Sequence, residues 1–136
     1  MKRTIFAVVV SFLLIGVMSH VVHTMWPIPI YSHYELIWAL RANRIPHRWL
    51  LWLGQLIFIV VFIWVYDKGV QPKPWVGQGL RYGLIMTLLT VVPAACTNYA
   101  LYPVTYTFLA KWIAEGGLQL ILLGLVVAGF CKRKMP

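Results

Sequence analysis

The sequence predicts an all-α membrane protein whose single transmembrane domain, residues 1–136, is a four-transmembrane-helix bundle. It contains apolar stretches of roughly 18–25 residues, each long enough to cross about 30 Å of hydrocarbon as a helix. These stretches cover residues 4–26, 49–66, 79–101 and 107–131. The chain is also 61% hydrophobic and only 11% charged, whereas soluble domains average about 45–50% and 25%. The connections are too short to form a soluble domain.

The first apolar stretch follows Lys2 and Arg3, an arrangement that also begins a signal peptide. Val17-Met18-Ser19 resembles a cleavage site, but the apolar run continues beyond it. We therefore expect residues 4–26 to be retained as the first span.

The first loop, residues 27–47, is unusual because it contains aromatic and aliphatic residues without long polar runs. Pro27 and Pro29 are expected to end the first helix. A short interfacial segment with aromatic side chains at headgroup level explains this composition. The alternative is a loop that faces a partner protein. Its contact residues would be Tyr31, His33, Tyr34, Trp38, Arg41, Arg44 and Arg48.

The second and third loops are short, so consecutive spans should be antiparallel neighbours. Asp67 and Arg81 flank the second loop and could form an ion pair. Small residues spaced four apart allow helix backbones to approach each other closely in a membrane, and a proline in a span is expected to kink it. Pro93 also frees a carbonyl, for which Thr90 is a candidate partner. The expected helix-packing residues are Gly79, Gly83, Pro93, Gly117 and Gly124.

The net charge of +9 does not indicate nucleic-acid binding, because basic residues beside spans usually set membrane orientation. Most of them fall on the side that carries both chain ends: Lys2, Arg3, Lys68, Lys73, Arg81, Lys132, Arg133 and Lys134. This bias predicts cytoplasmic termini. Cys96 and Cys131 then lie near opposite faces of the membrane, too far apart for a disulfide.

Polar residues within the apolar stretches are the candidates for function. At about 1.5 Å per residue, His20 lies about 24 Å along the first span and Gln55 about 9 Å from the outer end of the second. Together these residues predict an outer-leaflet polar layer to which every span contributes. Its members are His20, His23, Gln55, Asn98, Lys111 and Glu115.

Glu115 is the strongest of these candidates, because placing a carboxyl group within a span costs free energy and such residues often have a function. It could exchange a proton, balance a cationic ligand or bind a metal ion. The structural alternatives are an ion pair with Lys111, one turn earlier, or a hydrogen bond to Gln55 or a histidine.

No cofactor is predicted. His20 and His23 share one helix face, whereas bis-histidine haem ligation needs facing helices and the other spans contain no histidine. Haem, a metal ion or a quinone remain alternatives; His20, His23 and Glu115 would be the metal ligands. The sequence offers no nucleophile–base pair, so no catalytic residues are predicted, and the presence of only three acidic residues argues against general acid–base catalysis.

The second half of the chain resembles a family of small uncharacterised four-span bacterial membrane proteins. The resemblance is carried by Tyr66-Asp67-Lys68-Gly69, Gly79-Leu80-Arg81-Tyr82-Gly83-Leu84, Pro93, Tyr99-Ala100-Leu101-Tyr102-Pro103, Lys111-Trp112-Ile113, Gly117 and Gly124-Leu125-Val126. A histidine near the end of the first span, His20 or His23, also fits the pattern. The resemblance implies this architecture and a multi-pass location in the bacterial inner membrane, but no activity.

Two functions are consistent with these features. The chain could be a non-catalytic subunit, or a stabilising or assembly factor, of a larger membrane-protein complex. Alternatively, it could be a small binding or transport protein that holds a proton, a metal ion or a quinone-like or lipid-like ligand in its polar layer.

Overall fold

The computed structural model describes residues 2–25 and 48–131, and these residues are almost entirely helical. The elements are α1 (Lys2–Met25), α3 (Arg48–Gly69), α4 (Trp75–Met86), the π-helix η2 (Thr87–Val91), α5 (Val92–Leu101) and α6 (Tyr106–Phe130). The predicted interfacial segment in the first loop lies outside the described residues, so it stays a prediction.

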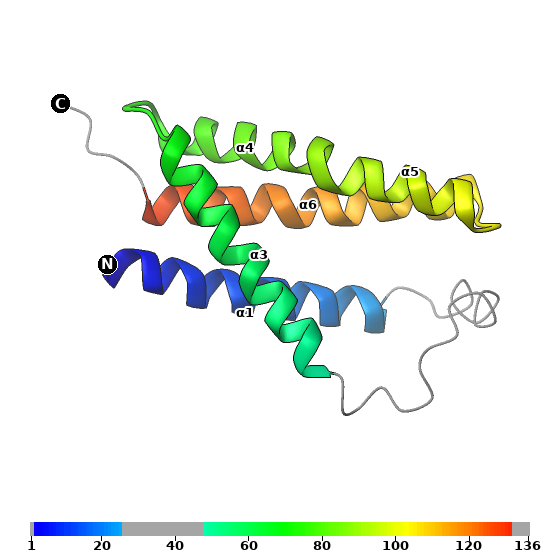
Figure 1. The fold of residues 1–136 in the computed structure, drawn as a ribbon. Helices are drawn as coiled ribbons and strands as arrows, with labels where there is room; N and C mark the ends of the chain where they lie inside the picture. Colours follow the sequence, from blue (N-terminus) through cyan, green and yellow to red (C-terminus); the bar gives the residue numbers. More distant parts are fainter. Residues whose placement is uncertain (1, 26–47, 132–136) are drawn as a thin grey trace.

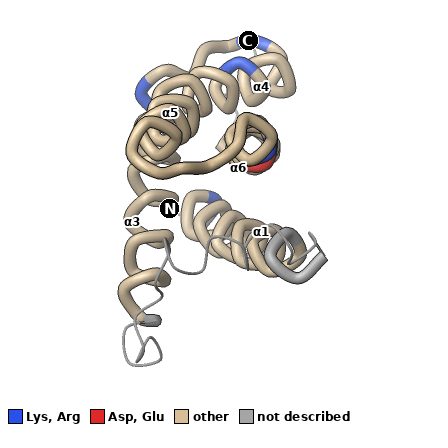
Figure 2. Tube along the Cα trace, turned by 90° about the vertical axis from the view of Figure 1, so that its right-hand side faces the viewer, with Lys and Arg blue, Asp and Glu red and all other residues tan. Residues whose placement is uncertain are grey.

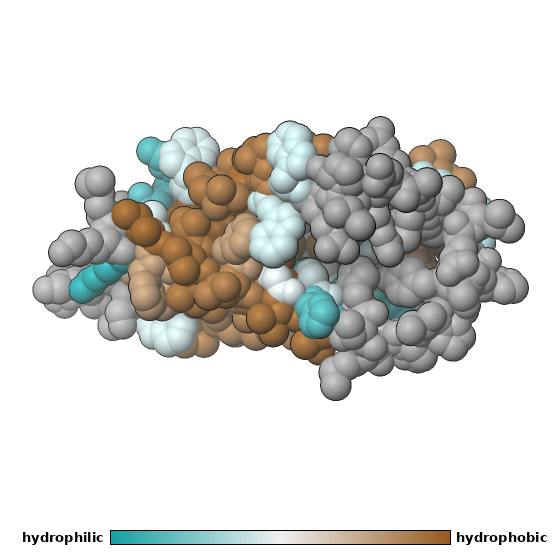
Figure 3. Space-filling view, turned by 90° about the horizontal axis from the view of Figure 1, so that it is seen from below, coloured by the Kyte–Doolittle hydropathy of each residue, from teal (hydrophilic) through white to brown (hydrophobic). Residues whose placement is uncertain are grey.

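Within residues 2–25 and 48–131, four helices are long and apolar enough to cross a membrane, as predicted. They cover Arg3–Val21, Trp49–Gly69, Trp75–Leu101 and Tyr106–Phe130. The third begins before the expected residue 79, because Pro74 occupies the N-cap position and Trp75 already has helical geometry. Figure 3 shows apolar residues over most of the described face on the α1 side, as expected for a surface in contact with lipid.

Three rods lie side by side and a fourth helix crosses them (Figure 1). One rod is α1, another is α6, and the third is the continuous run of α4, η2 and α5. The start of α1, the end of α3, the start of α4 and the end of α6 all lie at one end. Because α3 crosses obliquely and diverges from α4, the prediction that these two helices run as antiparallel neighbours is only partly correct.

The α4–α6 contact is held by glycine, as the four-residue spacing predicted. A Cβ added at Gly83 would lie 2.5 Å from Ile121 Cα, and one added at Gly79 would lie 2.8 Å from the Gly124 carbonyl oxygen. Gly117 is less tightly packed, since its added Cβ would lie 3.2 Å from Thr87 Cγ2. Backbone thus packs directly against backbone, which provides the close contact that helices in lipid require.

The distortion expected at Pro93 takes the form of a π-helical turn immediately before it. Within η2 the N–H group of Val92 donates to the carbonyl of Thr87, five residues earlier. π-helical turns often occur where the i→i−4 hydrogen bonds of an α-helix are interrupted. Thr90 was expected to satisfy the carbonyl freed by Pro93; instead its hydroxyl donates to the Met86 carbonyl at 2.7 Å.

An aromatic cluster joins α3 to α4. The Tyr82 hydroxyl donates to the Phe62 carbonyl at 2.6 Å, and the Tyr82 ring centroid lies 4.6 Å from that of Phe62 and 5.2 Å from that of Tyr66. The core beside this cluster is fully buried, with Ile59, Phe62, Leu123 and Val127 each 0% exposed.

The ion pair expected between Asp67 and Arg81 does not form among the described residues: both side chains are exposed, and no salt bridge joins them. Cys96 lies within α5 and Cys131 follows α6, and both thiols are free.

Candidate functional site: a polar cavity between the spans

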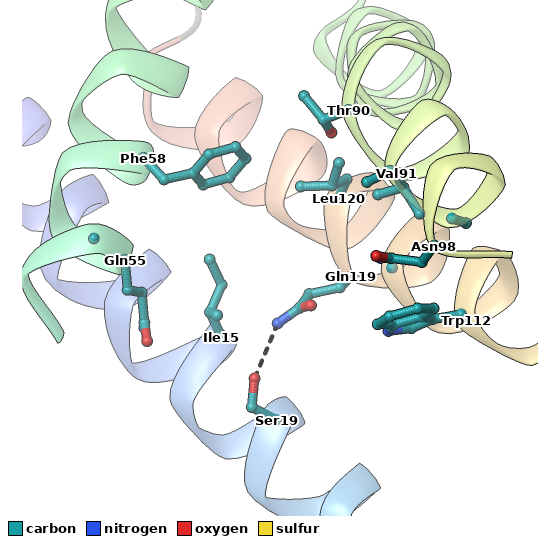
Figure 4. Close-up of a pocket in the computed structure, with 14 residues that line it drawn as sticks. Ile15, Ser19, Gln55, Phe58, Thr90, Val91, Asn98, Trp112, Gln119 and Leu120 are labelled. Carbon is teal, nitrogen blue, oxygen red and sulfur yellow. Dashed lines mark hydrogen bonds between the residues drawn. The ribbon is translucent and has the colours of Figure 1, made fainter. Parts of the chain in front are cut away.

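A cavity of about 520 Å³ lies between α1, α3, the η2–α5 segment and α6 (Figure 4). Neutral polar side chains line it: Ser19, Gln55, Thr90, Asn98 and Gln119. Apolar side chains complete the walls: Ile15, Phe58, Val91, Ala94, Ala95, Trp112 and Leu120. Residues from all four candidate spans therefore contribute to one site.

The cavity exists because the helices around it diverge and several lining residues are small. Towards its first residues α3 diverges from α4, α5 and α6, while Trp52 and Gln55 keep it in contact with α1. Gly54, Ala94, Ala95 and Gly116 present little or no side chain to the space that is left. One boundary is tight, because a Cβ at Gly116 would lie 2.8 Å from Val91 Cγ1.

Two glutamines connect the walls. Gln55 Nε2 of α3 donates to the Phe12 carbonyl of α1 at 2.9 Å. Gln119 Nε2 of α6 approaches Ser19 Oγ of α1 at 3.5 Å, at the limit of hydrogen-bond length. Figure 4 shows this second contact across the cavity.

The cavity retains unused hydrogen-bonding capacity. Within the described part of the chain, the Asn98 side-chain amide has no hydrogen-bond partner, and the carbonyl oxygens of Gln55 and Gln119 accept no bond. Unpaired polar groups in an apolar setting are costly. A bound molecule with its own hydrogen-bonding groups would relieve that cost.

The predicted polar layer is brought together only in part. Gln55 and Asn98 line the cavity, but His20, Lys111 and Glu115 do not. His20 is exposed on α1 beside Ser19. His23 belongs to α1, but its side chain lies outside the described part, as do the loop residues Tyr31 to Arg44 and the side chain of Arg48.

The charged pair of α6 faces a different direction from the cavity. Trp112, Gly116 and Gln119 line the cavity, whereas residues one position earlier in each turn lie about 100° around the helix. Figure 2 shows the charged residues of α6, Lys111 and Glu115, on the side away from α3. Both side chains are half-buried there.

Ser19, Thr90 and Gln119 were missed by the sequence prediction, which gave most weight to charged residues and histidines. Each is an uncharged polar residue inside an apolar run. Gln119 lies four residues after Glu115, so the sequence did contain a signal for it.

The chemistry available in the cavity is hydrogen bonding and aromatic contact. None of its described lining residues has an ionisable side chain. No group of three or more His, Cys, Asp or Glu side chains that could hold a metal ion occurs in residues 2–25 and 48–131. The described lining therefore suits a neutral molecule that forms hydrogen bonds and apolar contacts.

The helices and the site define an apolar helical protein whose four candidate spans indicate a multi-pass membrane protein. Comparisons with protein families, with curated proteins and with solved structures found no match. The resemblance to small bacterial membrane proteins therefore stays a prediction.

Proposed function

We propose that this chain is a non-catalytic membrane protein that binds an uncharged amphipathic molecule, quinone-like or lipid-like, in the cavity between its spans. The observation that carries the proposal is the lining: the Asn98 amide and the unbonded amide oxygens of Gln55 and Gln119 share the cavity with Phe58 and Trp112, and none of the lining residues that the structure describes is ionisable. The volume of about 520 Å³ is typical of small-molecule sites, which measure about 300–1,000 Å³.

Among the ligands expected from the sequence, this lining favours the quinone-like or lipid-like class. Proton exchange or metal binding needs titratable or ligating groups, and the described walls contain none. A neutral molecule with carbonyl or hydroxyl groups can instead pair with Asn98, Gln55 and Gln119, while its apolar part contacts the aromatic walls.

The test is the lipid content of the protein after mild detergent extraction, measured by mass spectrometry of an organic extract. A double variant, Asn98→Leu with Gln119→Leu, should lose the bound neutral molecule. The matched control is Glu115→Gln, which removes a negative charge of α6 outside the cavity. This variant should retain the bound neutral molecule. Equal content in all three proteins would contradict the proposal.

The second candidate is a subunit or assembly factor of a larger membrane complex. It is favoured by the first turns of α3, in which Trp49 is 59%, Leu51 73% and Trp52 59% exposed. We expect larger subunits to co-purify in that case. A chain that purifies alone, with its cavity ligand bound, would count against it.

For either function we propose a bacterial inner-membrane location with both termini in the cytoplasm. The support is the excess of basic residues at the end where the α1 start and the α6 end lie together. Labelling of a single cysteine introduced at Lys73, with a reagent that cannot cross membranes, tests this orientation.

A further inference from the structure

A second cavity, of about 530 Å³, lies between the end of α3 and the start of α4, and its lining is of a different kind. Its rim is polar and cationic, with Lys73 and Arg81. Its apolar wall is formed by Val65, Tyr82 and Ile85. A cationic rim above an apolar wall matches the two parts of a phospholipid.

The loop at this rim is held in place by one side chain. The Gln78 side-chain amide donates to the carbonyls of Gln71 at 2.8 Å and Lys73 at 2.9 Å, and it accepts from the Gln71 N–H at 2.8 Å. These three bonds fix the connection from α3 to α4. They therefore fix the backbone of Lys73 beside the cavity before any ligand arrives.

The positive charge at the rim is not balanced from within. None of the described lining residues is Asp or Glu, and neither Lys73 nor Arg81 forms an ion pair with any residue in the described ranges. Arg81 lies about 9 Å along α4 from Trp75. A cation at that depth in a span is costly unless it meets an anion or reaches the interface.

Two further features favour an anion here. The α4 helix starts at the cavity, and its first N–H groups form the positive end of the helix dipole, without a side-chain cap at Pro74. Tyr66, which is 3% exposed, also lines the cavity, and its hydroxyl has no hydrogen-bond partner among the described residues.

We propose that this cavity binds the phosphate headgroup of an anionic phospholipid, with Arg81 and Lys73 on the phosphate and the acyl chains along Val65 and Ile85. The planar guanidinium of arginine suits bidentate contact with phosphate, and basic pockets between membrane helices bind such headgroups. The site is separate from the cavity of the proposed function and does not depend on it.

The experiment is a titration of the full chain in detergent with phosphatidylglycerol and, separately, with phosphatidylcholine, read by native mass spectrometry. Each cation near the headgroup contributes about fivefold in affinity, so Lys73→Gln with Arg81→Gln should weaken phosphatidylglycerol binding about 30-fold. Phosphatidylcholine has the same phosphate group, but its choline cation offsets the charge, so it should bind the wild type more weakly and lose less affinity in the double variant. The single variant Arg81→Lys keeps both positive charges, so it should retain most of the wild-type affinity for phosphatidylglycerol.

The control is Lys68→Gln, which removes one positive charge at the same end of the bundle. The Lys68 ammonium lies 5.6 Å from the Trp64 ring centroid and does not line the cavity, so the change should be less than about twofold. Because Lys73 and Arg81 are exposed, all variants should keep the wild-type melting temperature.

Three outcomes would overturn the proposal. One is wild-type phosphatidylglycerol affinity in the double variant. Another is an equal loss in Lys68→Gln, which would indicate general surface charge instead of a site. The third is competition by inorganic phosphate or glycerol phosphate as strong as that by the lipid, which would make a free phosphate the ligand.

Discussion

Where α4 meets α6, backbone lies directly against backbone; where α3 leaves the bundle, a cavity of about 520 Å³ opens. Small residues occur on both sides, but they act differently. Gly79, Gly83 and Gly124 let two antiparallel helices close together. Gly54, Ala94 and Ala95 lie where the helices diverge, so the same lack of side chain leaves space.

The two regions therefore have different roles: the α4–α6 contact stabilises the fold, and the cavity beside α3 is suited to binding. Lipid tails are as apolar as leucine, so helix association in a membrane depends on close packing and hydrogen bonds. The α4–α6 contact supplies the packing. By contrast, α3 is held by a few specific contacts, among them the hydrogen bonds of Tyr82 and Gln55. Because α3 does not pack closely along its whole length, polar groups beside it can stay unpaired.

The largest effect on the free energy of unfolding is expected when a methyl group is added where α4 and α6 already touch. In Gly83→Ala the new Cβ would meet the Ile121 Cα at 2.5 Å and the Leu120 carbonyl oxygen at 2.7 Å, both backbone atoms that cannot rotate away. Overpacking of this kind costs about 1–3 kcal/mol. The measurement is the free energy of unfolding in detergent. Gly77→Ala, on the same helix with nothing within 4 Å, is the control and should lose no stability.

An effect of similar size is expected at the link between α3 and α4. Tyr82→Leu removes two ring contacts, each worth about 0.5–1.5 kcal/mol, together with the hydrogen bond to the Phe62 carbonyl. Tyr82→Phe removes only the hydrogen bond and should cost about 0.6 kcal/mol. Unfolding free energies that rank the two variants in the opposite order would show that the aromatic cluster does not hold α3.

A smaller effect is expected at the cavity itself. Gln55→Leu loses the 2.9 Å bond to the Phe12 carbonyl and should cost about 0.6 kcal/mol. Gln119→Leu loses only a 3.5 Å contact and should cost less, although it should weaken ligand binding. A greater loss of stability in Gln119→Leu would mean that this residue is structural.

The smallest effect is local and lies just beyond α6. Burial raises the pKa of the Cys131 thiol above 9.0, and the negative charge of Asp67 raises it further. Because only the thiolate reacts, alkylation by iodoacetamide should reach its half-maximal rate above pH 9.0. Asp67→Asn removes the charge, so it should lower the pKa and speed alkylation at a given pH. A pH profile unchanged by Asp67→Asn would contradict this account.

The lengths of the spans and the glycine contacts could be predicted because they depend on local composition and on spacing within one helix. The start of α4 at Trp75 was missed because the apolar stretch was taken to begin at Gly79, although a preceding proline favours a helix start. The cavity could not be predicted, since it depends on the oblique path of α3. Lys111 and Glu115 were expected in the same layer as Gln55, because depth along a span was considered without rotation around the helix.

The most direct test of the central claim is to fill the cavity without changing its polarity. Ala94→Leu adds bulk to the cavity wall, whereas Ala100→Leu adds the same bulk to an exposed position of α5 that does not line it. Native mass spectrometry of the intact protein after mild extraction reads the bound molecule. We predict that wild type and Ala100→Leu retain a neutral amphipathic adduct and that Ala94→Leu loses it. An adduct equally present in all three proteins, or absent from wild type, would contradict the account.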